Sequence, residues 1–387
     1  MAILDRSPNK HASDRHELLL IPGPTMLPPE VREAMAAQMV NHRGEAFGRI
    51  LREVLEGLGR IYETASPVLP FAASGTGGLE AAVANVLSPG DRVLALSCGA
   101  FGDRFAEIAR TYGAEVITLE APWGTGIEPD AVAAALRRHA PVAAVLVTHN
   151  ETSTGVANDL AALAGVVRPT GTLLLVDAVS SLGALELRTD AWGLDVVVAG
   201  SQKALMGPPG AVFISVSSRA WEAARRSRTP RVYFSFERAR DALGAGPTAF
   251  TPFTPAVPAI YALAVSIPMI LEEGLPARVE RHRRMARMVR EGVARVGLEV
   301  LPPPRWASDT VTAVRVPETV DARTLLRRLR EEHGVVLAGG QGRLEGRIIR
   351  IGHMGAVDAR DLQRGLEALA GVLRAMGHPV SRAVSAP

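Results

Sequence analysis

The residue of this chain best suited to covalent chemistry is Lys203, because lysine is almost absent from the sequence. The 387 residues hold 43 cationic side chains, of which two are lysines, Lys10 and Lys203, and the other forty-one are arginines. Arginine replaces lysine as a surface cation, but only lysine has an amine that forms an imine with a carbonyl compound. That chemistry needs the neutral amine, which burial beside other cations favours by lowering the pKa.

Lys203 and Asp177 each follow an apolar run, in DVVVAGSQKALMGPPG and LLLVDAVSSLG respectively. We interpret both runs as buried strands, whose carboxyl ends lie at the edge where open α/β sheets bind ligands. An aspartate in this place can cap the following turn. Alternatively, it can form an ion pair with the pyridinium nitrogen of pyridoxal phosphate and so keep the ring electron-withdrawing.

A phosphate site is predicted at the turn Ser74-Gly75-Thr76, where a strand gives way to a helix in ASGTGGLEAA. Backbone N–H groups and hydroxyls at a helix start can bind phosphate. The turn does not match the dinucleotide fingerprint GxGxxG, because Glu80 occupies its last position, and no Gly-Lys pair follows to make a P-loop. The sequence therefore disfavours a nucleotide as ligand.

Two further side chains are candidates for binding flat or anionic groups. Phe101, in SCGAFGDRF, offers a ring that can stack on a cofactor, or it can belong to the core of a helix. Arg350 ends a predicted strand in RIIRIGHMG, where its planar guanidinium can bind a substrate carboxylate through two parallel hydrogen bonds.

Composition narrows the function classes further. The net charge of +3 arises from interspersed charges without a basic run, so nucleic-acid binding has no specific support. The single cysteine, Cys98, gives no metal-ligand spacing and is typical of a reducing compartment. No apolar run is long enough to span a membrane, and the first residues are unlike a signal peptide. We therefore predict a cytoplasmic protein without a bound metal.

Alternating apolar runs and amphipathic stretches between residues 67 and 216 predict a mainly parallel sheet with helices on both faces. An arginine-rich loop, ARRSRTPRVYFSF, and a Pro/Thr-rich stretch, PTAFTPFTPAVP, are expected outside the sheet. The predicted α/β chain divides into an N-terminal segment (1–20), a large domain (21–271), a small C-terminal α+β domain (272–378) and a loose tail (379–387).

Taken together, these residues resemble the class V (fold-type I) pyridoxal-phosphate aminotransferases, specifically the alanine–glyoxylate / serine–pyruvate aminotransferase family. The resemblance covers nearly the whole chain and rests on seven ordered motifs: LLLIPGPTMLPPEV, NHRGEAF, SGTGGLEAA, THNETSTGV, LLLVDAVSSLG, GSQKALMGPPG and RIGHMG. It implies a large domain with a mainly parallel seven-stranded sheet flanked by helices, and pyridoxal 5'-phosphate as cofactor.

The resemblance also implies roles for individual residues. Lys203 would bind the cofactor covalently and move a proton as general base, while Asp177 would pair with the ring nitrogen. Phe101 would stack on the ring in place of the tryptophan of other members, and Thr152 would hydrogen-bond near the phenolic oxygen. The remaining implied ligands would bind the cofactor phosphate: Ser74, Gly75, Thr76 and Gln202.

The family's phosphate site is completed by the neighbouring subunit, which implies a homodimer with shared active sites. FTPFTP aligns with that contribution and supplies Thr254 and Thr251, the latter a tyrosine in some members. Arg350 would bind the substrate carboxylate. The implied lining of the substrate pocket comes from two pairs of residues near the amino terminus, Pro22 with Gly23 and His42 with Arg43. Some members of the family lack the pair His42 and Arg43.

The leading functional hypothesis is ping-pong transamination from an amino acid to glyoxylate or pyruvate, small acceptors that suit the single carboxylate contact of Arg350. The resemblance implies serine, alanine or a similar amino acid as the donor. A ureidoglycine–glyoxylate or aminoethylphosphonate-type transaminase is an alternative on the same scaffold. A cysteine desulfurase-like lyase would need Cys98 as a mobile nucleophile. A non-catalytic interaction protein with this fold is disfavoured by the presence of Lys203, Asp177 and Arg350.

Overall fold

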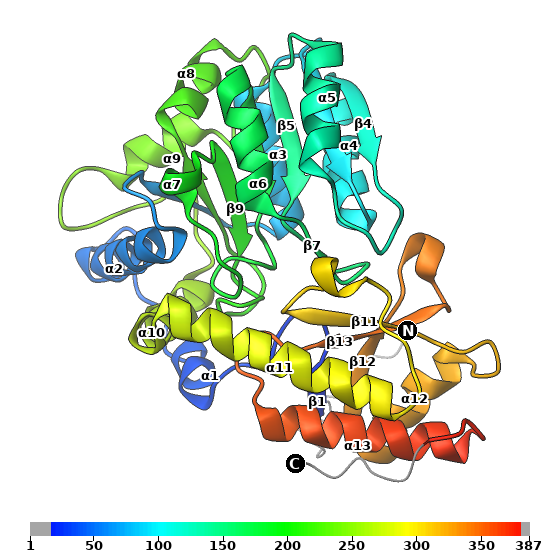
Figure 1. Ribbon diagram of the computed structural model, residues 1–387. Coiled ribbons are helices and arrows are strands. Elements are labelled where there is room, and N and C mark those ends of the chain that lie inside the picture. The colour runs from blue at the N-terminus through cyan, green and yellow to red at the C-terminus, as the bar shows by residue number, and fades with distance from the viewer. Residues whose placement is uncertain (1–16, 381–387) are drawn as a thin grey trace, which may run out of the picture.

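The computed structural model describes residues 17–380, and Figure 1 shows a large α/β part above a smaller α+β part. The large part is built on a seven-stranded sheet, and the smaller part on a four-stranded sheet. A two-stranded hairpin, β6 (Asn150–Glu151) with β7 (Val156–Ala157), lies between the two parts. The α/β fold class predicted from the sequence is confirmed.

The seven-stranded sheet has the strand order β2-β10-β9-β8-β5-β3-β4. Its strands are β2 (Val68–Phe71), β3 (Arg92–Ser97), β4 (Glu115–Glu120), β5 (Ala144–Thr148), β8 (Leu173–Asp177), β9 (Val196–Gly200) and β10 (Val212–Val216). All neighbours pair in parallel except β10, which is antiparallel to both β2 and β9. Every residue of β5, β8 and β9 is buried, as expected for parallel strands covered on both faces.

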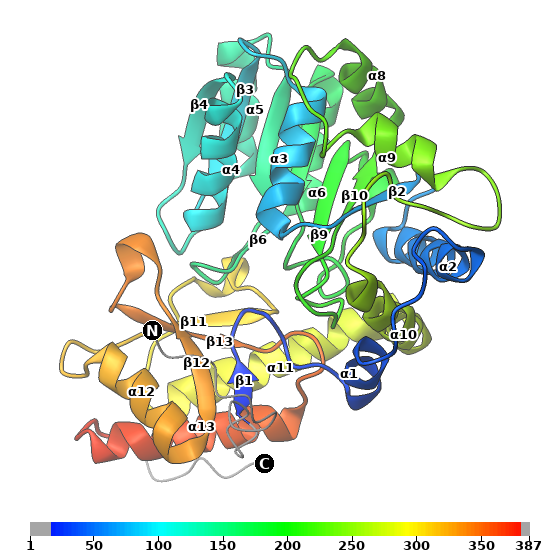
Figure 2. The same cartoon turned by 180° about the vertical axis from the view of Figure 1, so that it is seen from behind.

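Helices cover the two faces of this sheet. One face carries α3 (Gly75–Val86), α4 (Ala100–Thr111) and α8 (Ser218–Arg226), as Figure 2 shows. The other carries α5 (Pro129–His139), α6 (Leu160–Val167) and α7 (Thr189–Trp192), which lie in front in Figure 1. The sequence run ARRSRTPRVYFSF is only partly the loop that we expected, because its first residues complete α8 and its last begin α9 (Phe236–Leu243). Serine caps start both helices.

The smaller part packs three helices against a sheet of strand order β1-β12-β13-β11. Its elements are β1 (Leu18–Leu20), α11 (Leu275–Arg295), β11 (Val311–Arg315), α12 (Ala322–His333), β12 (Val335–Gly339), β13 (Ile348–Gly352) and α13 (Ala359–Ala375). Sequence reasoning assigned no strand to residues 18–20, but β1 pairs in parallel with β12. The division into domains stays a prediction, and most of the predicted tail, 381–387, lies outside the described residues.

Three helices outside the main layers complete the chain: α1 (Pro29–Met35), α2 (Glu45–Tyr62) and α10 (Val257–Glu273). The helices α10 and α11 meet at Gly274, whose φ of +79° falls in the left-handed region that favours glycine. Within residues 17–380 no single helix is long and apolar enough to cross a membrane. The pair α10 and α11 meets that test only jointly, across a bend of 88°.

Candidate active site

A cavity of about 150 Å³ opens at the carboxyl edge of the seven-stranded sheet. Most of the residues predicted to bind the cofactor line it: Ser74, Gly75, Thr76, Phe101, Thr152, Asp177, Gln202 and Lys203. They come from the carboxyl ends of β2, β3, β8 and β9 or the turns that follow them, and Thr152 comes from the β6–β7 hairpin that follows β5. Parallel strands bring such ends to one edge. The lining also includes residues that sequence reasoning did not assign: Leu79, Arg104, Asn150, Val179 and Ser180.

Lys203 is held by residues 22–25, which follow β1 and are called the amino-terminal segment of the site. Its Nζ donates a hydrogen bond to the carbonyl oxygen of Pro22, and its own carbonyl oxygen accepts one from Thr25 Oγ1 at 3.0 Å. Burial first, and then the positive charge of Arg350, lower the pKa of the Lys203 amine to about 8, while Asp177 acts in the opposite direction. The lowered pKa therefore increases the fraction of the neutral amine that imine formation requires.

Gly23 allows the amino-terminal segment to approach this lysine. Its φ of +116° is rarely adopted by L residues, and a Cβ atom placed there would lie 2.5 Å from Lys203 Cδ. Any other side chain would therefore both strain the backbone and displace the lysine.

Asp177 ends β8 and is almost fully buried beside the cavity. Its Oδ1 accepts a hydrogen bond from the backbone N–H of Val179 at 3.0 Å. Burial raises the pKa of this carboxyl to about 6, although the Val179 bond and the charge of Lys203 partly counteract the rise. A protonated ring nitrogen in the cavity would supply a positive charge that favours the ionised form of Asp177 and opposes the rise of its pKa.

The start of α3 offers an anion site at one side of the cavity. Ser74 caps the helix by accepting from the N–H of Gly77 at 3.4 Å, and Gly75 packs so closely that a Cβ would lie 2.8 Å from Val179 Cγ2. Arg104 Nη1 donates to Thr76 Oγ1 at 3.5 Å and brings a positive charge to the same turn. A helix N-terminus beside a guanidinium suits a phosphate.

Phe101 is fixed by a buried carboxylate that sequence reasoning missed. Glu151 is fully buried and accepts from the backbone N–H groups of Phe101 and Gly102, both at 3.0 Å, and from Ser153 through its N–H at 3.1 Å and its Oγ at 2.6 Å. Burial raises the pKa of Glu151, and these bonds oppose the rise. Although Glu151 lies in the motif NETSTG, only the fold brings it to the start of α4.

Arg350 lies on β13 with its guanidinium oriented by two carbonyl groups. Its Nε donates to Gly339 at 2.8 Å and its Nη1 donates to Thr152 at 3.1 Å. The side chain is buried, which lowers its pKa to about 10. The bond to Thr152 connects the smaller part of the chain directly to the cavity that contains Lys203.

The remaining predicted residues lie elsewhere in this chain. Neither His42 nor Arg43 lines the Lys203 cavity, and Arg43 donates instead to the carbonyl oxygens of Thr251 at 3.1 Å and Pro252 at 3.3 Å. The Thr251 hydroxyl donates to the carbonyl of Phe253 at 2.6 Å, whereas Thr254 is exposed. Both threonines line a different pocket, between β2 and the 251–256 loop.

These features fit pyridoxal phosphate. The start of α3 and the Arg104 guanidinium suit the phosphate, and the buried carboxyl of Asp177 suits the ring nitrogen. The Lys203 amine, whose pKa is lowered, suits the aldehyde carbon. Gly23 and Gly75 are places where any Cβ would fill the space needed around Lys203 and the α3 turn.

Comparison with known proteins gives the same class. The family model described as aminotransferase class-V matches residues 18–351. A Synechococcus protein named soluble hydrogenase, small subunit, is 41% identical over 93% of this chain and 94% of its own length. Serine–glyoxylate aminotransferase of Methylorubrum extorquens is 37% identical over 91% of this chain and 89% of its own length.

Among solved structures, ureidoglycine–glyoxylate aminotransferase of Bacillus subtilis is similar with a TM-score of 0.91 and 30% identity over 96% of each chain. Alanine–glyoxylate aminotransferase of Nostoc has a TM-score of 0.90 and 33% identity, with 97% of this chain and 100% of that chain covered. The chain therefore belongs to the class-V aminotransferases. It is a pyridoxal-phosphate-dependent transaminase of fold type I.

Proposed function

We propose that this enzyme transfers the amino group of a small amino acid, such as serine or alanine, to glyoxylate or pyruvate by a ping-pong mechanism. The observation that carries the proposal is the buried guanidinium of Arg350, held by the carbonyl groups of Gly339 and Thr152, the second of which belongs to the Lys203 cavity. One such group binds one carboxylate, which both partners of the reaction possess. The names of the relatives, which pair serine or alanine with glyoxylate, support the same substrates.

When bound, the cofactor supplies the electron sink that stabilises negative charge at the substrate α-carbon. Lys203 is the proposed general base, whose neutral Nζ takes the proton from the α-carbon and later returns it. The lowered pKa of its amine supports this role, because a larger fraction is ready to accept a proton near neutral pH. Asp177 is proposed to hold a proton on the ring nitrogen through an ion pair.

The other cavity residues are proposed to orient the cofactor. Phe101 would present its ring as a stacking surface, held by Glu151, and Thr152 would lie near the phenolic oxygen. The proposed phosphate ligands are those at the α3 start and the residue before the lysine: Ser74, Gly75, Thr76 and Gln202. Arg104 joins this set because its guanidinium already contacts the Thr76 hydroxyl.

The substrate is proposed to bind between Arg350 and the amino-terminal segment. Arg350 would bind the α-carboxylate, and the backbone at Pro22 and Gly23 would form the opposing wall. Because Pro22 accepts from Lys203 Nζ, this wall also places the amine within reach of the reacting carbon.

We further propose a homodimer in which Thr254, and less directly Thr251, reaches the phosphate site of the partner. The exposure of Thr254 supports this arrangement, as do the exposed Met39, Val40 and Met269. A cytoplasmic location stays a prediction that rests on the single cysteine.

The ureidoglycine–glyoxylate alternative draws support from the Bacillus subtilis structure, while nothing in the site specifically favours an aminoethylphosphonate. The desulfurase alternative gains no support from Cys98, which is buried against Asn158 Nδ2 at 3.5 Å. Burial also raises the pKa of this thiol to about 12, and a nucleophile must be a thiolate.

The decisive experiment measures half-reactions of the holoenzyme. Each of serine, alanine, aspartate, ureidoglycine and 2-aminoethylphosphonate is added alone, and the loss of the visible absorbance band is recorded. Glyoxylate or pyruvate is then added to restore the band. We expect serine or alanine to react fastest and Lys203→Arg to be inactive with all donors. A protein whose band responds to none of these donors would refute the proposed function.

His42 and Arg43 are tested in the same assay. If they contribute to substrate choice, Arg43→Met will lose activity toward one donor and keep it toward the others. A uniform loss toward every donor would instead assign Arg43 to support of the 251–252 loop, which it contacts in this chain.

A further inference from the structure

Three consecutive carbonyl groups around the catalytic lysine are held by residues far away in sequence. The N–H of Thr25 donates to Gln202 at 3.1 Å, the Thr25 hydroxyl donates to Lys203 at 3.0 Å, and Arg278 Nη2 donates to Ala204 at 2.7 Å. The turn that follows needs such support, because Met206 has a φ of +57°. The backbone that carries Lys203 is thus fixed from outside its own loop.

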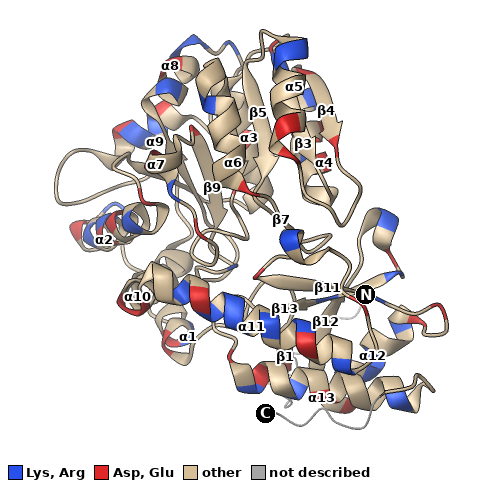
Figure 3. Cartoon of the chain, viewed as in Figure 1, with Lys and Arg blue, Asp and Glu red and all other residues tan. Residues whose placement is uncertain are grey.

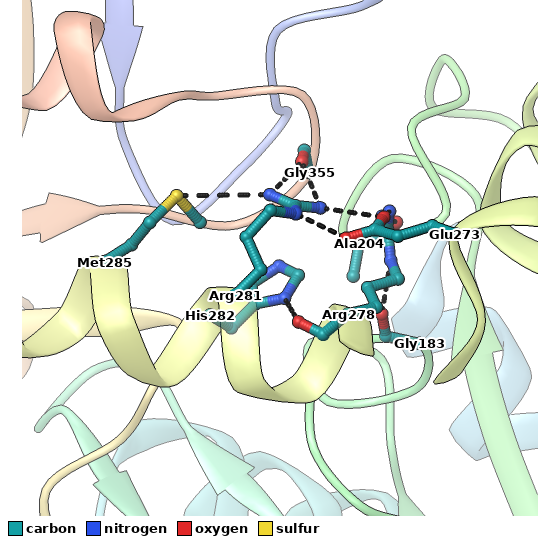
Figure 4. Close-up of polar contacts among 8 residues, drawn as sticks. All are labelled: Gly183, Ala204, Glu273, Arg278, Arg281, His282, Met285 and Gly355. Carbon is teal, nitrogen blue, oxygen red and sulfur yellow. Dashed lines mark hydrogen bonds and ion pairs between the residues drawn. The ribbon is translucent and has the colours of Figure 1, made fainter. Parts of the chain in front are cut away.

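Arg278 joins this loop to the one that follows Asp177. The residue lies on α11 and is 1% exposed. Its Nε donates to the carbonyl of Gly183 at 2.7 Å, in the loop after β8, so one planar guanidinium holds both loops. Figure 4 shows the side chain between Gly183, Ala204 and Glu273. Arg278 therefore fixes the loop that carries the Lys203 amine relative to the loop that follows the Asp177 carboxyl.

Glu273 extends the contact toward the smaller part of the chain. Its Oε2 accepts from Arg278 Nη1 at 2.7 Å and its Oε1 accepts from Arg281 Nε at 2.6 Å. Burial alone would raise the pKa of Glu273, but the two arginines outweigh it and lower the pKa, so the carboxylate stays ionised. Arg281 in turn donates from Nη1 and Nη2 to the carbonyl of Gly355, each at 3.4 Å.

Gly355 closes the connection between the two parts. It lies in the turn that follows β13, the strand that carries Arg350, and its φ is +84°. A Cβ on Gly355 would lie 3.0 Å from Thr25 Oγ1, the hydroxyl that donates to Lys203. The same turn therefore touches both Arg281 and the residue that holds the lysine carbonyl.

We propose that Arg278 is a positioning residue for Lys203 and Asp177, and that Glu273 and Arg281 connect this support to the turn after Arg350. The proposal rests on the roles proposed above for Lys203, Asp177 and Arg350. Arg278 acts through the backbone, since it contacts neither reacting group. Lysine cannot replace it, because a single ammonium on a flexible stem does not reproduce three donors held in one plane.

An adjoining groove of about 830 Å³ makes the test practicable. Glu273, Arg278 and Arg281 line it together with Met206 and Met285. Because Arg278 itself lines this groove, we expect its replacement to open a path for water to the carbonyls that it leaves unpaired, so that a variant keeps its fold while it loses the geometry.

The experiment compares Arg278→Met, Arg278→Lys and Arg281→Met with Arg287→Met. Arg287 is the matched control, because it lies on the same helix, has a side chain that is 54% exposed and, within residues 17–380, forms an ion pair only with Glu280, at 3.0 Å. Each variant is measured for Tm with and without cofactor, for the pH midpoint of the visible absorbance band, and for kcat and KM.

Both Arg278 variants are expected to lower kcat by about ten- to a hundredfold and to shift the pH midpoint of the band, at temperatures well below Tm. Arg278→Lys should not rescue either quantity. Arg281→Met is expected to raise KM for the amino donor more than it lowers kcat, because it releases the turn after Arg350. Arg287→Met should match the wild type.

A fall in Tm with kcat and band midpoint unchanged would assign Arg278 to stability alone and overturn the proposal. If Arg278→Met does not fold, Arg278→Lys and Arg281→Met decide: wild-type kcat, KM and band midpoint in both would likewise overturn it. A wild type that transfers no amino group would refute the proposed function, whereas the band midpoint and Tm would still test the positioning of Lys203.

Discussion

The amine of Lys203 should titrate far below an ordinary lysine in the cofactor-free protein. Burial and Arg350 lower its pKa from 10.5 to about 8. At pH 7 a lysine with the lower value is roughly 10% neutral, against about 0.03% for the ordinary one, a difference of about 300-fold in reactive amine. This ratio is the quantity that the structure predicts.

Competitive acylation measures the pKa of the Lys203 amine, from which this ratio follows. The cofactor-free protein is labelled with a trace of acetic anhydride at a series of pH values, together with Nα-acetyl-lysine amide as the ordinary amine, and peptide mass spectrometry follows the peptide that contains Lys203. The midpoint of labelling, not the absolute rate, reports the pKa, so limited access to the cavity does not affect it. We expect a midpoint about 2.5 pH units below that of the reference amine.

Two variants should shift the labelling midpoint of Lys203 in opposite directions. Arg350→Met should raise the midpoint, because the positive charge of Arg350 lowers the pKa of Lys203, and Asp177→Asn should lower it, because Asp177 acts in the other direction. A midpoint near that of the reference amine, or shifts of the same sign in the two variants, would refute this account of the site.

The same pKa has a consequence for stability. Between about pH 8 and 10.5 the unfolded chain holds a proton on Lys203 that the folded chain has released, so the free energy of unfolding rises with pH through this window. The rise is at most about 3.4 kcal/mol, from a pKa difference of 2.5 at about 1.36 kcal/mol per pKa unit. Denaturant titrations of Lys203→Met should lack this component, and an identical pH slope in wild type and variant would contradict it.

Three further predictions concern single residues. Glu151→Gln should lower the free energy of unfolding, measured by denaturation, by about 1 to 3 kcal/mol for each buried N–H left unpaired. It should also weaken cofactor binding through Phe101, measured by cofactor titration. Unchanged values in both measurements would contradict the role of the carboxylate. Gly23→Ala should reduce kcat with a smaller effect on Tm, since its Cβ meets Lys203, and wild-type turnover would count against that contact. Cys98→Ala should keep turnover, and thiol reagents should leave native Cys98 unmodified; an inactive Cys98→Ala enzyme would revive the desulfurase alternative.

The sequence predicted the class of the fold and the cofactor because their signals are local. Asp177 and Lys203 each follow a run of residues whose apolar character dictates a buried strand, and parallel strands bring such ends to one edge. The Ser74 turn was predictable for the same reason. The stacking role of Phe101 could be predicted only from its place in a motif.

The supports of the site were not predictable from local pattern. Arg278 is one of forty-one arginines and lies in α11, a helix rich in them (Figure 3), so nothing in the sequence distinguishes it from its exposed neighbours. Its burial arises only when α11 packs beneath the loops that contain Gly183 and Ala204. Glu151 likewise looks like an ordinary surface carboxylate until the start of α4 folds over it.

Two differences from the expected organisation have simple physical reasons. The strand β10 is antiparallel because the short loop after Lys203 returns the chain directly beside β9, whereas a parallel strand needs a crossover. The strand β1 has only three residues, too few for a periodic signal, and its partner β12 lies at the other end of the sequence.

The pairing of β1 with β12 also determines the order in which parts of the chain can fold during synthesis. Leu18 pairs with Val335, so β1 cannot find its partner until the ribosome has added the residues of β12. The wall at Pro22 and Gly23 follows β1 directly, and we expect it to settle over Lys203 only after that moment. The large sheet can form earlier, but a nascent chain that lacks β12 will present its lysine without this wall and is expected to acquire the cofactor only at the end of synthesis.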